Sequence, residues 1–284
     1  MGIVVTGATG HLGRHVVGQL LEKVPADRIT AVVRNADRAA DLAGRGVRIA
    51  VADYNAPETF DGVFAAGDKV LLISGSEVDQ DRVAQHRVVI DAARAAGVAL
   101  LAYTSAPGTL TASLADAHRG TEEVLLGSGL PYTLLRNCWY HEVYTENLAP
   151  VLEHRAVVAA AGEGRVSSAS RADYAAAAVA VLTGEGHENK TYELAGDRAW
   201  SFAEYAAELS RQTGEEIAYR KVTQEELTAI LTGAGLPEPV AAVYAGADAS
   251  IAKGELVVDS GDLSRLTGRP TTPLSEAITA ALKG

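Results

Sequence analysis

Three glycines spaced three residues apart follow the first apolar run of the chain. The segment VVTGATGHLGRHV (residues 4–16) places them between that run and a helix-like pattern. Such a loop presents backbone N–H groups and a helix N-terminus to an anion such as a pyrophosphate. The spacing G-x-x-G-x-x-G predicts a dinucleotide-binding loop; a tight turn without a ligand is the alternative. The residues expected at the dinucleotide are Gly7, Ala8, Thr9, Gly10, His11, Leu12 and Gly13.

An arginine ends the second apolar run, ITAVVR (residues 29–34). At this position an acidic residue commonly accepts hydrogen bonds from the ribose of NAD, whereas an arginine pairs with the 2′-phosphate of NADP. Arg34 therefore favours NADPH as the cofactor, and a solvated surface arginine is the alternative. Arg38 either assists or lies on an exposed helix face.

Polar residues follow the later runs, at the ends where ligands of open parallel sheets bind. Asp53 is placed either to meet the adenine or to cap a turn, and the sequence favours neither. Hydroxyl and backbone groups after the next two runs are expected along the ribose and nicotinamide, or as caps of the strand ends. These candidates are Ser74, Gly75, Ser76 and Thr104.

The elements that position these residues alternate along the first half of the chain. The apolar runs, at 3–5, 29–34, 47–53, 69–74, 99–105 and 132–137, are apolar on successive residues, as in strands buried on both faces. Amphipathic helices are expected between them, one along Leu12–Val24 and one closed by Gly97. The fold class is therefore α/β, a Rossmann-type doubly wound parallel sheet.

The C-terminal third changes to helical patterns. Ser201 with Glu204, and Thr223 with Glu226, have capping-box spacing, and Thr272 precedes Pro273 as a helix start. We expect a smaller, mostly helical substrate or cap lobe. The predicted dinucleotide-binding domain is 1–137 plus about 156–196, and the lobe is about 138–155 plus 197–284.

Composition excludes several classes of protein. The net charge of −11 disfavours binding to nucleic acid or to anionic membranes. The longest apolar run, at 174–182, is too short to cross a bilayer. A single cysteine and the absence of a signal-peptide pattern predict a cytoplasmic protein, and no spacing typical of a metal site is present. A monomer and a homodimer are both compatible with the sequence.

The Tyr-x-x-x-Lys pair of most short-chain reductases is missing, because none of the ten tyrosines has a lysine four residues later. His118 and Glu122 occupy the corresponding places. Reduction of a simple ketone needs a positioned acid, since an alkoxide is nearly as basic as hydroxide. A hydroquinone is a phenol with a pKa of ~10, so its anion can leave and take a proton from water. A quinone or a cationic dye therefore needs positioning more than acid catalysis.

Two residues, His118 and Tyr103, are candidates for a catalytic role. His118 has an ordinary pKa near neutrality and can donate a proton, although a partly exposed helix histidine is the favoured interpretation. Tyr103, with Trp139 and Tyr140, either stacks on a planar acceptor or packs in the core. Cys138 is interpreted as a small buried residue.

The blocks VTGATGHLG, VRNADRA, AYTSA, YTLLRNCWYHE, SASRADYAAAA and GRPTTPLSEAI run in the order found in the NmrA-like atypical short-chain dehydrogenases/reductases. The chain resembles this family over essentially its whole length. Within it, the similarity is to bacterial NAD(P)H:quinone oxidoreductases of type 2 and to triphenylmethane dye reductases. The resemblance implies NADPH as cofactor. It also implies a contact with the nicotinamide half for Asn137, Cys138, Trp139 and Tyr140, and a cofactor contact for Arg171, which is otherwise a first-turn helix residue.

Two functions remain open from the sequence. One is transfer of a hydride from NADPH to a quinone-like or other conjugated electrophile, a small-molecule partner. The other is a non-catalytic NADP(H)-binding redox sensor that regulates a protein partner, which the missing Tyr/Lys pair equally permits. Turnover of NADPH distinguishes them.

Overall fold

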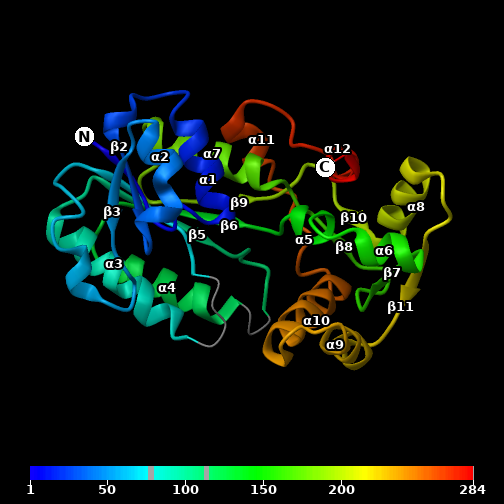
Figure 1. The fold of residues 1–284 in the computed structure, drawn as a ribbon. Helices are drawn as coiled ribbons and strands as arrows, with labels where there is room; N and C mark the ends of the chain where they lie inside the picture. The colour runs from blue at the N-terminus through cyan, green and yellow to red at the C-terminus, as the bar shows by residue number, and fades with distance from the viewer. Residues whose placement is uncertain (76–79, 112–114, 284) are drawn as a thin grey trace. The chain divides into compact units, whose positions relative to one another are not determined.

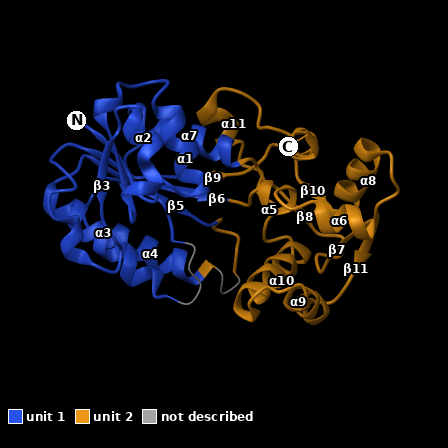
Figure 2. Ribbon diagram, viewed as in Figure 1, with its two compact units in different colours: residues 1–106, 116–137, 171–192 blue, residues 107–115, 138–170, 193–284 orange. Residues whose placement is uncertain are grey.

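The structure is a computed structural model that describes residues 1–75, 80–111 and 115–283, and it divides into two compact units (Figure 2). Unit 1 comprises 1–106, 116–137 and 171–192, and unit 2 comprises 107–115, 138–170 and 193–284. The segment 156–170, which we expected with the dinucleotide-binding domain, lies in unit 2. Its two strands pair with later strands of unit 2, which the sequence pattern did not indicate.

The principal sheet has seven strands in the order β3-β2-β1-β4-β5-β6-β9. The five pairings among its first six strands are all parallel. Strands β2 and β4 are buried at every residue, as their continuous apolar runs predicted. The expected α/β Rossmann-type fold is confirmed. The strands are β1 (Ile3–Val5), β2 (Ile29–Val33), β3 (Arg48–Val51), β4 (Lys69–Leu72), β5 (Leu100–Ser105), β6 (Tyr132–Asn137) and β9 (Lys190–Leu194).

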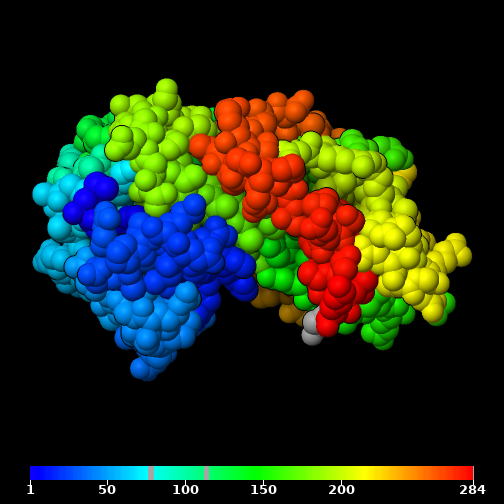
Figure 3. Space-filling model, turned by 90° about the horizontal axis from the view of Figure 1, so that it is seen from above, coloured from blue at the N-terminus to red at the C-terminus, as the bar shows by residue number. Residues whose placement is uncertain are grey.

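Helices cover both faces of this sheet in unit 1, with α1, α2 and α7 on one face and α3 and α4 on the other (Figure 1). On the first face, the Gln19 side chain of α1 donates to the Ala172 carbonyl of α7 at 2.9 Å, which links the two helices. The segments of α1 and α7 also adjoin in the view from above, in blue and yellow-green (Figure 3). The helices are α1 (His11–Leu20), α2 (Ala40–Gly44), α3 (Arg82–Ala96), α4 (Asp116–Gly127) and α7 (Arg171–Thr183), with the 3₁₀ turns η1 (Ala26–Arg28), η2 (Ala36–Ala39) and η3 (Pro57–Phe60).

Two helix ends test the expected boundaries. α3 ends before Gly97, whose φ of +69° is the left-handed conformation that glycine supplies at a helix C-terminus, as predicted. α1 ends at Leu20, so Leu21 and Val24 lie beyond the helix on which we expected them. The sequence contains no glycine or proline between Leu20 and Val24 that would have marked this earlier end.

The sheet order fixes where a ligand is to be sought. β1 and β4 are neighbours, yet the chain continues from β1 towards β2 and β3 and from β4 towards β5 and β6. The crevice at the carboxyl ends of two such strands is the usual ligand site of open α/β sheets. Residues that follow β1 and β4 are therefore the centre of the candidate site.

Unit 2 is mostly helical, and it adds two small sheets that we did not predict. β7 (Ala156–Ala159) pairs in parallel with β11 (Ala218–Lys221), and β8 (Arg165–Val166) pairs antiparallel with β10 (Trp200–Ser201). Both predicted capping boxes are present. The last helix begins at Leu274, one residue after the predicted Pro273. The helices are α5 (Glu142–Thr145), α6 (Ala149–His154), α8 (Phe202–Thr213), α9 (Gln224–Gly233), α10 (Glu238–Ala252), α11 (Asp262–Thr267) and α12 (Leu274–Lys283).

Within the described ranges, no helix combines the length and the apolar character that crossing a bilayer requires.

Candidate cofactor-binding site

The glycine loop joins β1 to α1 and is folded against itself. Gly7 has a φ of +59°, and its carbonyl accepts the Gly10 N–H at 2.9 Å. The N–H of Ala8 donates to the Val32 carbonyl of β2 at 3.3 Å, which ties the loop to the neighbouring strand. The left-handed conformation at Gly7 is the tight turn for which the first glycine was expected.

Gly13 fits beneath this loop with no room for a side chain. A Cβ atom there would lie 2.3 Å from the Gly7 carbonyl oxygen and 2.8 Å from the Ala8 Cα. Ala8 and Leu12 are buried. Gly7, Gly10 and His11 are exposed, and Thr9 is half-buried.

The N-terminus of α1 is open to a ligand. Gly10 is the N-cap, and among the described residues no side chain caps the helix there. A Cβ at Gly10 would meet a single neighbour, the Gly7 carbonyl, at 3.2 Å. An exposed, uncapped helix N-terminus next to bare backbone is a cradle of the kind that a pyrophosphate fits.

Arg34 directly follows β2 and is exposed. The chain beyond it is held by short contacts: Asn35 accepts the Asp37 N–H at 2.8 Å and so caps η2. Arg14 of α1 donates to the Arg38 carbonyl at 2.7 Å, which fastens the same turn to the glycine-loop helix. The backbone around the predicted 2′-phosphate site is thereby fixed on two sides.

Asp53 follows β3, where one of its two predicted roles is visible. Its Oδ1 accepts the Asn55 N–H at 2.9 Å, and its own N–H donates to Thr59 Oγ1 at 2.9 Å. Asp53 therefore caps a turn, and its contact with adenine stays a prediction.

The backbone after β4 is held by side chains of neighbouring elements. Thr6, the first residue after β1, accepts the Ile73 N–H at 3.1 Å, and Thr104 of β5 accepts the Ser74 N–H at 2.9 Å. The Tyr54 hydroxyl lies 2.5 Å from Thr6 Oγ1 and 3.1 Å from the Ile73 carbonyl oxygen. The structure thus brings the predicted Ser74 and Thr104 together at the switch-point crevice. Ser76 lies outside the described residues.

Tyr103 of β5 and His118 of α4 contact each other. The Tyr103 hydroxyl lies 3.0 Å from His118 Nδ1, and Tyr103 is fully buried. Burial raises the pKa of Tyr103 to about 12. His118 is half-buried, as expected, and its desolvation, with help from the Arg82 charge, lowers its pKa to about 3. Both groups therefore keep the same neutral form across the physiological pH range.

Glu122, at the second place of the missing Tyr/Lys pair, is locked in a salt bridge. Its carboxylate accepts Arg136 Nε at 2.9 Å and Nη2 at 2.6 Å, and its Oε1 accepts the Ser105 hydroxyl at 2.6 Å. The side chains are 9% and 25% exposed for Glu122 and Arg136 respectively. The bidentate salt bridge joins α4 to the end of β6, and the Ser105 hydrogen bond joins α4 to the end of β5.

The remaining predicted residues divide between the two units. Asn137 ends β6 in unit 1, and Arg171 is the first residue of α7 in the same unit. Cys138 belongs to unit 2, where its N–H donates to the Leu194 carbonyl at 2.9 Å. Burial raises the pKa of its thiol to about 12, so it stays a thiol, in agreement with its interpretation as a small buried residue. Trp139 and Tyr140 are half-buried in unit 2, at a bridge to Ala169.

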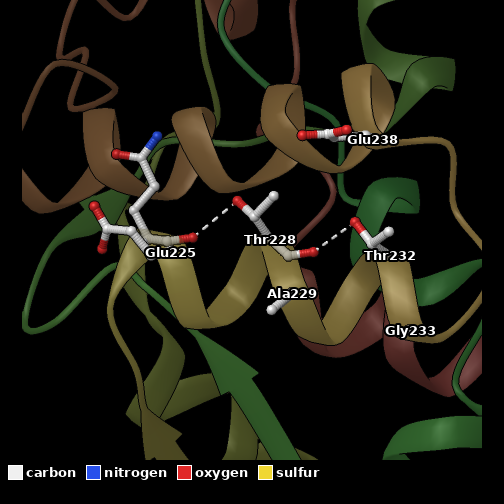
Figure 4. A pocket seen from close by; sticks show the side chains of 7 residues that line it. Glu225, Thr228, Ala229, Thr232, Gly233 and Glu238 are labelled. Atoms are coloured by element: carbon white, nitrogen blue, oxygen red, sulfur yellow. Dashed lines mark hydrogen bonds between the residues drawn. The ribbon is translucent and has the colours of Figure 1, made fainter.

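A hollow on unit 2 between α9 and α10 offers a less suitable place for a dinucleotide (Figure 4). The hydroxyls of its threonines, Thr228 and Thr232, donate hydrogen bonds to carbonyls of their own helix, at 2.9 Å and 2.8 Å. The two acidic residues of its lining are Glu225 and Glu238, so it is unsuited to the phosphate-bearing dinucleotide.

The family comparison agrees with the loop and the fold. The model of an NAD(P)H-binding family matches residues 7–185, more than half of the chain, so the chain belongs to this family. The resemblance to NmrA-like reductases drawn from the sequence is confirmed, and the protein is an NAD(P)H-binding enzyme.

Particular relatives are similar over nearly the whole length. Quinone oxidoreductase 2 of Escherichia coli is 46% identical over 278 residues, 97% of each chain. An NAD(P)H azoreductase of Xenophilus azovorans is 32% identical over 96% of each chain. The crystal structure of an NADPH-dependent quinone oxidoreductase of E. coli with NADPH has a TM-score of 0.95, 46% identity and 99% coverage of each chain. A Citrobacter triphenylmethane reductase has a TM-score of 0.95, 42% identity and 100% coverage of each chain.

Several residues of this edge escaped the sequence analysis. Thr6 and Tyr54 lie in the loops after β1 and β3, His86 lies on α3 and Arg136 on β6, and each makes a hydrogen bond to a residue distant in sequence. Only Thr6 carried a signal, because it directly follows the first strand beside the glycine loop.

Proposed function

We propose that the protein is an NADPH-dependent reductase that transfers a hydride to a quinone-like or other conjugated electrophilic acceptor. The bound dinucleotide supplies the hydride, and the protein binds and orients both reactants. The observation that carries the proposal is the pair of α4 residues in place of Tyr and Lys. His118 is neutral and engaged with Tyr103, and Glu122 is engaged with Arg136 and Ser105.

This arrangement suits an acceptor whose product needs no protein acid. Tyr103 retains its proton and His118 carries no charge near neutral pH, because burial shifts their pKa values to about 12 and about 3. A hydroquinone anion takes its proton from water, and a dye cation takes a hydride with no proton at all. The names of the quinone, azo-dye and triphenylmethane-dye reductases among the relatives support this class of acceptor.

The residues proposed to hold the dinucleotide follow from the cradle. Exposed backbone at Gly7 and Gly10 and the open N-terminus of α1 would receive the pyrophosphate, and Arg34 the 2′-phosphate. The structure of a relative with NADPH supports this choice of dinucleotide. The other contacts proposed from the residues themselves are Ala8, Thr9, His11, Leu12, Gly13, Asp53, Ser74, Gly75 and Thr104. Asn137, Cys138, Trp139, Tyr140 and Arg171 are proposed from the family resemblance alone.

The decisive experiment is oxidation of NADPH by the purified protein, followed at 340 nm with menadione or benzoquinone and with NADH in parallel. Turnover that prefers NADPH supports the proposal. Tight binding of NADPH without turnover on any quinone would contradict it and favour the redox sensor.

Replacing Arg34 with alanine is expected to raise the Michaelis constant for NADPH by roughly 10- to 100-fold, and that for NADH hardly at all. A charge-assisted hydrogen bond contributes about 1.5–3 kcal/mol, and ~1.4 kcal/mol corresponds to tenfold. Steady-state kinetics with both cofactors measures the effect. Arg45→Ala, an exposed arginine at the end of α2, is the matched control. Equal effects on NADPH and NADH would contradict the assignment.

The pH profile of kcat is expected to be flat from about pH 6.5 to 9. The pKa of His118 lies at about 3 and that of Tyr103 at about 12, so neither group titrates in this range. His118→Gln should accordingly change kcat by less than about threefold and leave the profile flat. A drop in kcat of a hundredfold, or a limb near pH 7 that the variant removes, would make His118 a proton donor.

A further inference from the structure

The three residues after β4 are held without strand pairing. Each of their backbone N–H groups donates to a side chain: Ile73 to Thr6, Ser74 to Thr104, and Gly75 to His86 Nε2 at 3.0 Å. Arg82 Nη1 also donates to the Gly75 carbonyl, at 3.3 Å. His86 is thus the last of three side chains that accept backbone N–H groups along residues 73–75, at the switch-point crevice.

The partners of His86 determine which of its nitrogens carries the proton. A backbone N–H only donates, so His86 Nε2 must be the unprotonated acceptor and Nδ1 must carry hydrogen. Nδ1 lies 2.8 Å from Thr121 Oγ1, and the Thr121 hydroxyl donates to the Ala117 carbonyl at 2.8 Å. One directed chain therefore runs from Gly75 through His86 and Thr121 to the first turn of α4.

The surroundings of His86 keep it in this neutral form. The side chain is fully buried, and its ring contacts Tyr103 and Tyr54 edge-on, with centroids 5.4 Å and 6.1 Å apart. Burial and the Arg82 charge lower the pKa of His86 to about 4. A proton on Nε2 would face the Gly75 N–H, so protonation and this geometry exclude each other.

We propose that His86 is a positioning residue of the cofactor site, which fixes the Ser74–Gly75 backbone relative to α4 through Gly75 and Thr121. This proposal rests on the proposed function, because it takes Ser74 and Gly75 as contacts of the dinucleotide. It assigns His86 no contact with the cofactor or with the acceptor. Its effect is on how well NADPH binds, through the backbone that His86 holds.

The main test compares two variants. His86→Phe keeps a ring of similar size but offers no acceptor to Gly75 and no donor to Thr121, whereas His86→Gln offers both an amide oxygen and an N–H group. The dissociation constant of NADPH, measured by fluorescence titration without any acceptor, is expected to rise roughly tenfold in the Phe variant. The NADPH dissociation constant of the Gln variant should lie within about threefold of that of the unmodified protein. In both variants kcat with menadione should change less than the NADPH dissociation constant.

A control separates positioning from general loss of stability. Ile90→Val, one helical turn further along α3 and fully buried, should lower the melting temperature without changing the NADPH dissociation constant. The proposal is overturned if His86→Phe folds and binds NADPH normally, if Ile90→Val weakens binding as much, or if Gln fails to rescue.

A second readout needs no cofactor. The ¹⁵N chemical shifts of the His86 ring are expected to show a proton on Nδ1 and none on Nε2 at pH 7. A proton on Nε2 would overturn the proposal even if NADPH binding were never detected. Binding of NADPH without turnover would instead contradict the proposed function and leave the His86 comparison valid, because that comparison uses binding alone.

Discussion

Replacing Gly13 with alanine is expected to weaken NADPH binding by more than about a hundredfold, roughly 2.8 kcal/mol. The added Cβ would lie 2.3 Å from the Gly7 carbonyl oxygen and 2.8 Å from the Ala8 Cα. Both neighbours are backbone atoms of the loop, so no side chain can swing aside and the loop itself must move. The phosphate cradle is built from that same backbone, and its distortion removes the N–H geometry that an anion needs.

The same helix provides a matched control for this change. Gly18 lies five residues further along α1, and a Cβ there would meet nothing within 4 Å. Gly18→Ala should leave the NADPH dissociation constant unchanged and raise the free energy of unfolding by about 0.5–1 kcal/mol. Titration of both variants with NADPH, together with thermal melts, measures the two effects. Normal binding by Gly13→Ala would remove the glycine loop from the site.

Glu122→Gln is expected to lower the free energy of unfolding by about 2–3 kcal/mol, a fall of roughly 3–5 °C in Tm. The substitution removes the carboxylate that accepts from the Arg136 guanidinium, and the 25% exposure of the Arg136 side chain moderates the cost. Circular dichroism melts at low and high salt measure the loss. Salt should change it little, since ions screen buried pairs weakly.

Two further variants decide whether the unpaired charge is the cause. Asp91→Asn breaks the Asp91–Arg94 pair on α3, whose side chains are more than half exposed, and should cost less than about 1 kcal/mol. The double variant Glu122→Gln/Arg136→Leu removes both charges and should recover much of the stability lost in the single variant. A double variant less stable than the single one would show that Arg136 stabilises the fold through other contacts.

The sequence predicted the elements of the fold because their signals are local. Continuous apolar runs such as ITAVV and KVLL mark strands buried on both faces, and β2 and β4 are found there. Capping pairs three residues apart, such as Ser201 with Glu204, satisfy a helix N-terminus from within one turn. The first glycine of the loop was predictable for the same reason, since the left-handed turn at Gly7 is a property of the backbone there.

Contacts between distant segments were beyond such reasoning. The division of the chain moved 156–170 into unit 2, because β7 and β8 pair with β11 and β10, some 60 and 35 residues later. His118 is half-buried on α4, as its favoured interpretation expected, but its desolvation and the Arg82 charge lower its pKa to about 3, which its residue type alone did not indicate. Desolvation depends on everything packed around a group, and this packing is absent from a linear pattern.

The sequence by itself determined a parallel α/β sheet, a glycine loop after its first strand, an arginine after its second and the absence of a Tyr/Lys pair. Each of these is readable within a few residues, since backbone conformation, strand burial and charge type are properties of short segments. Only the tertiary structure decided that Glu122 is bound to Arg136 and that His86 receives the Gly75 N–H. Hydrogen bonds and salt bridges require atoms within about 3 Å, and the folded chain alone brings such distant residues that close.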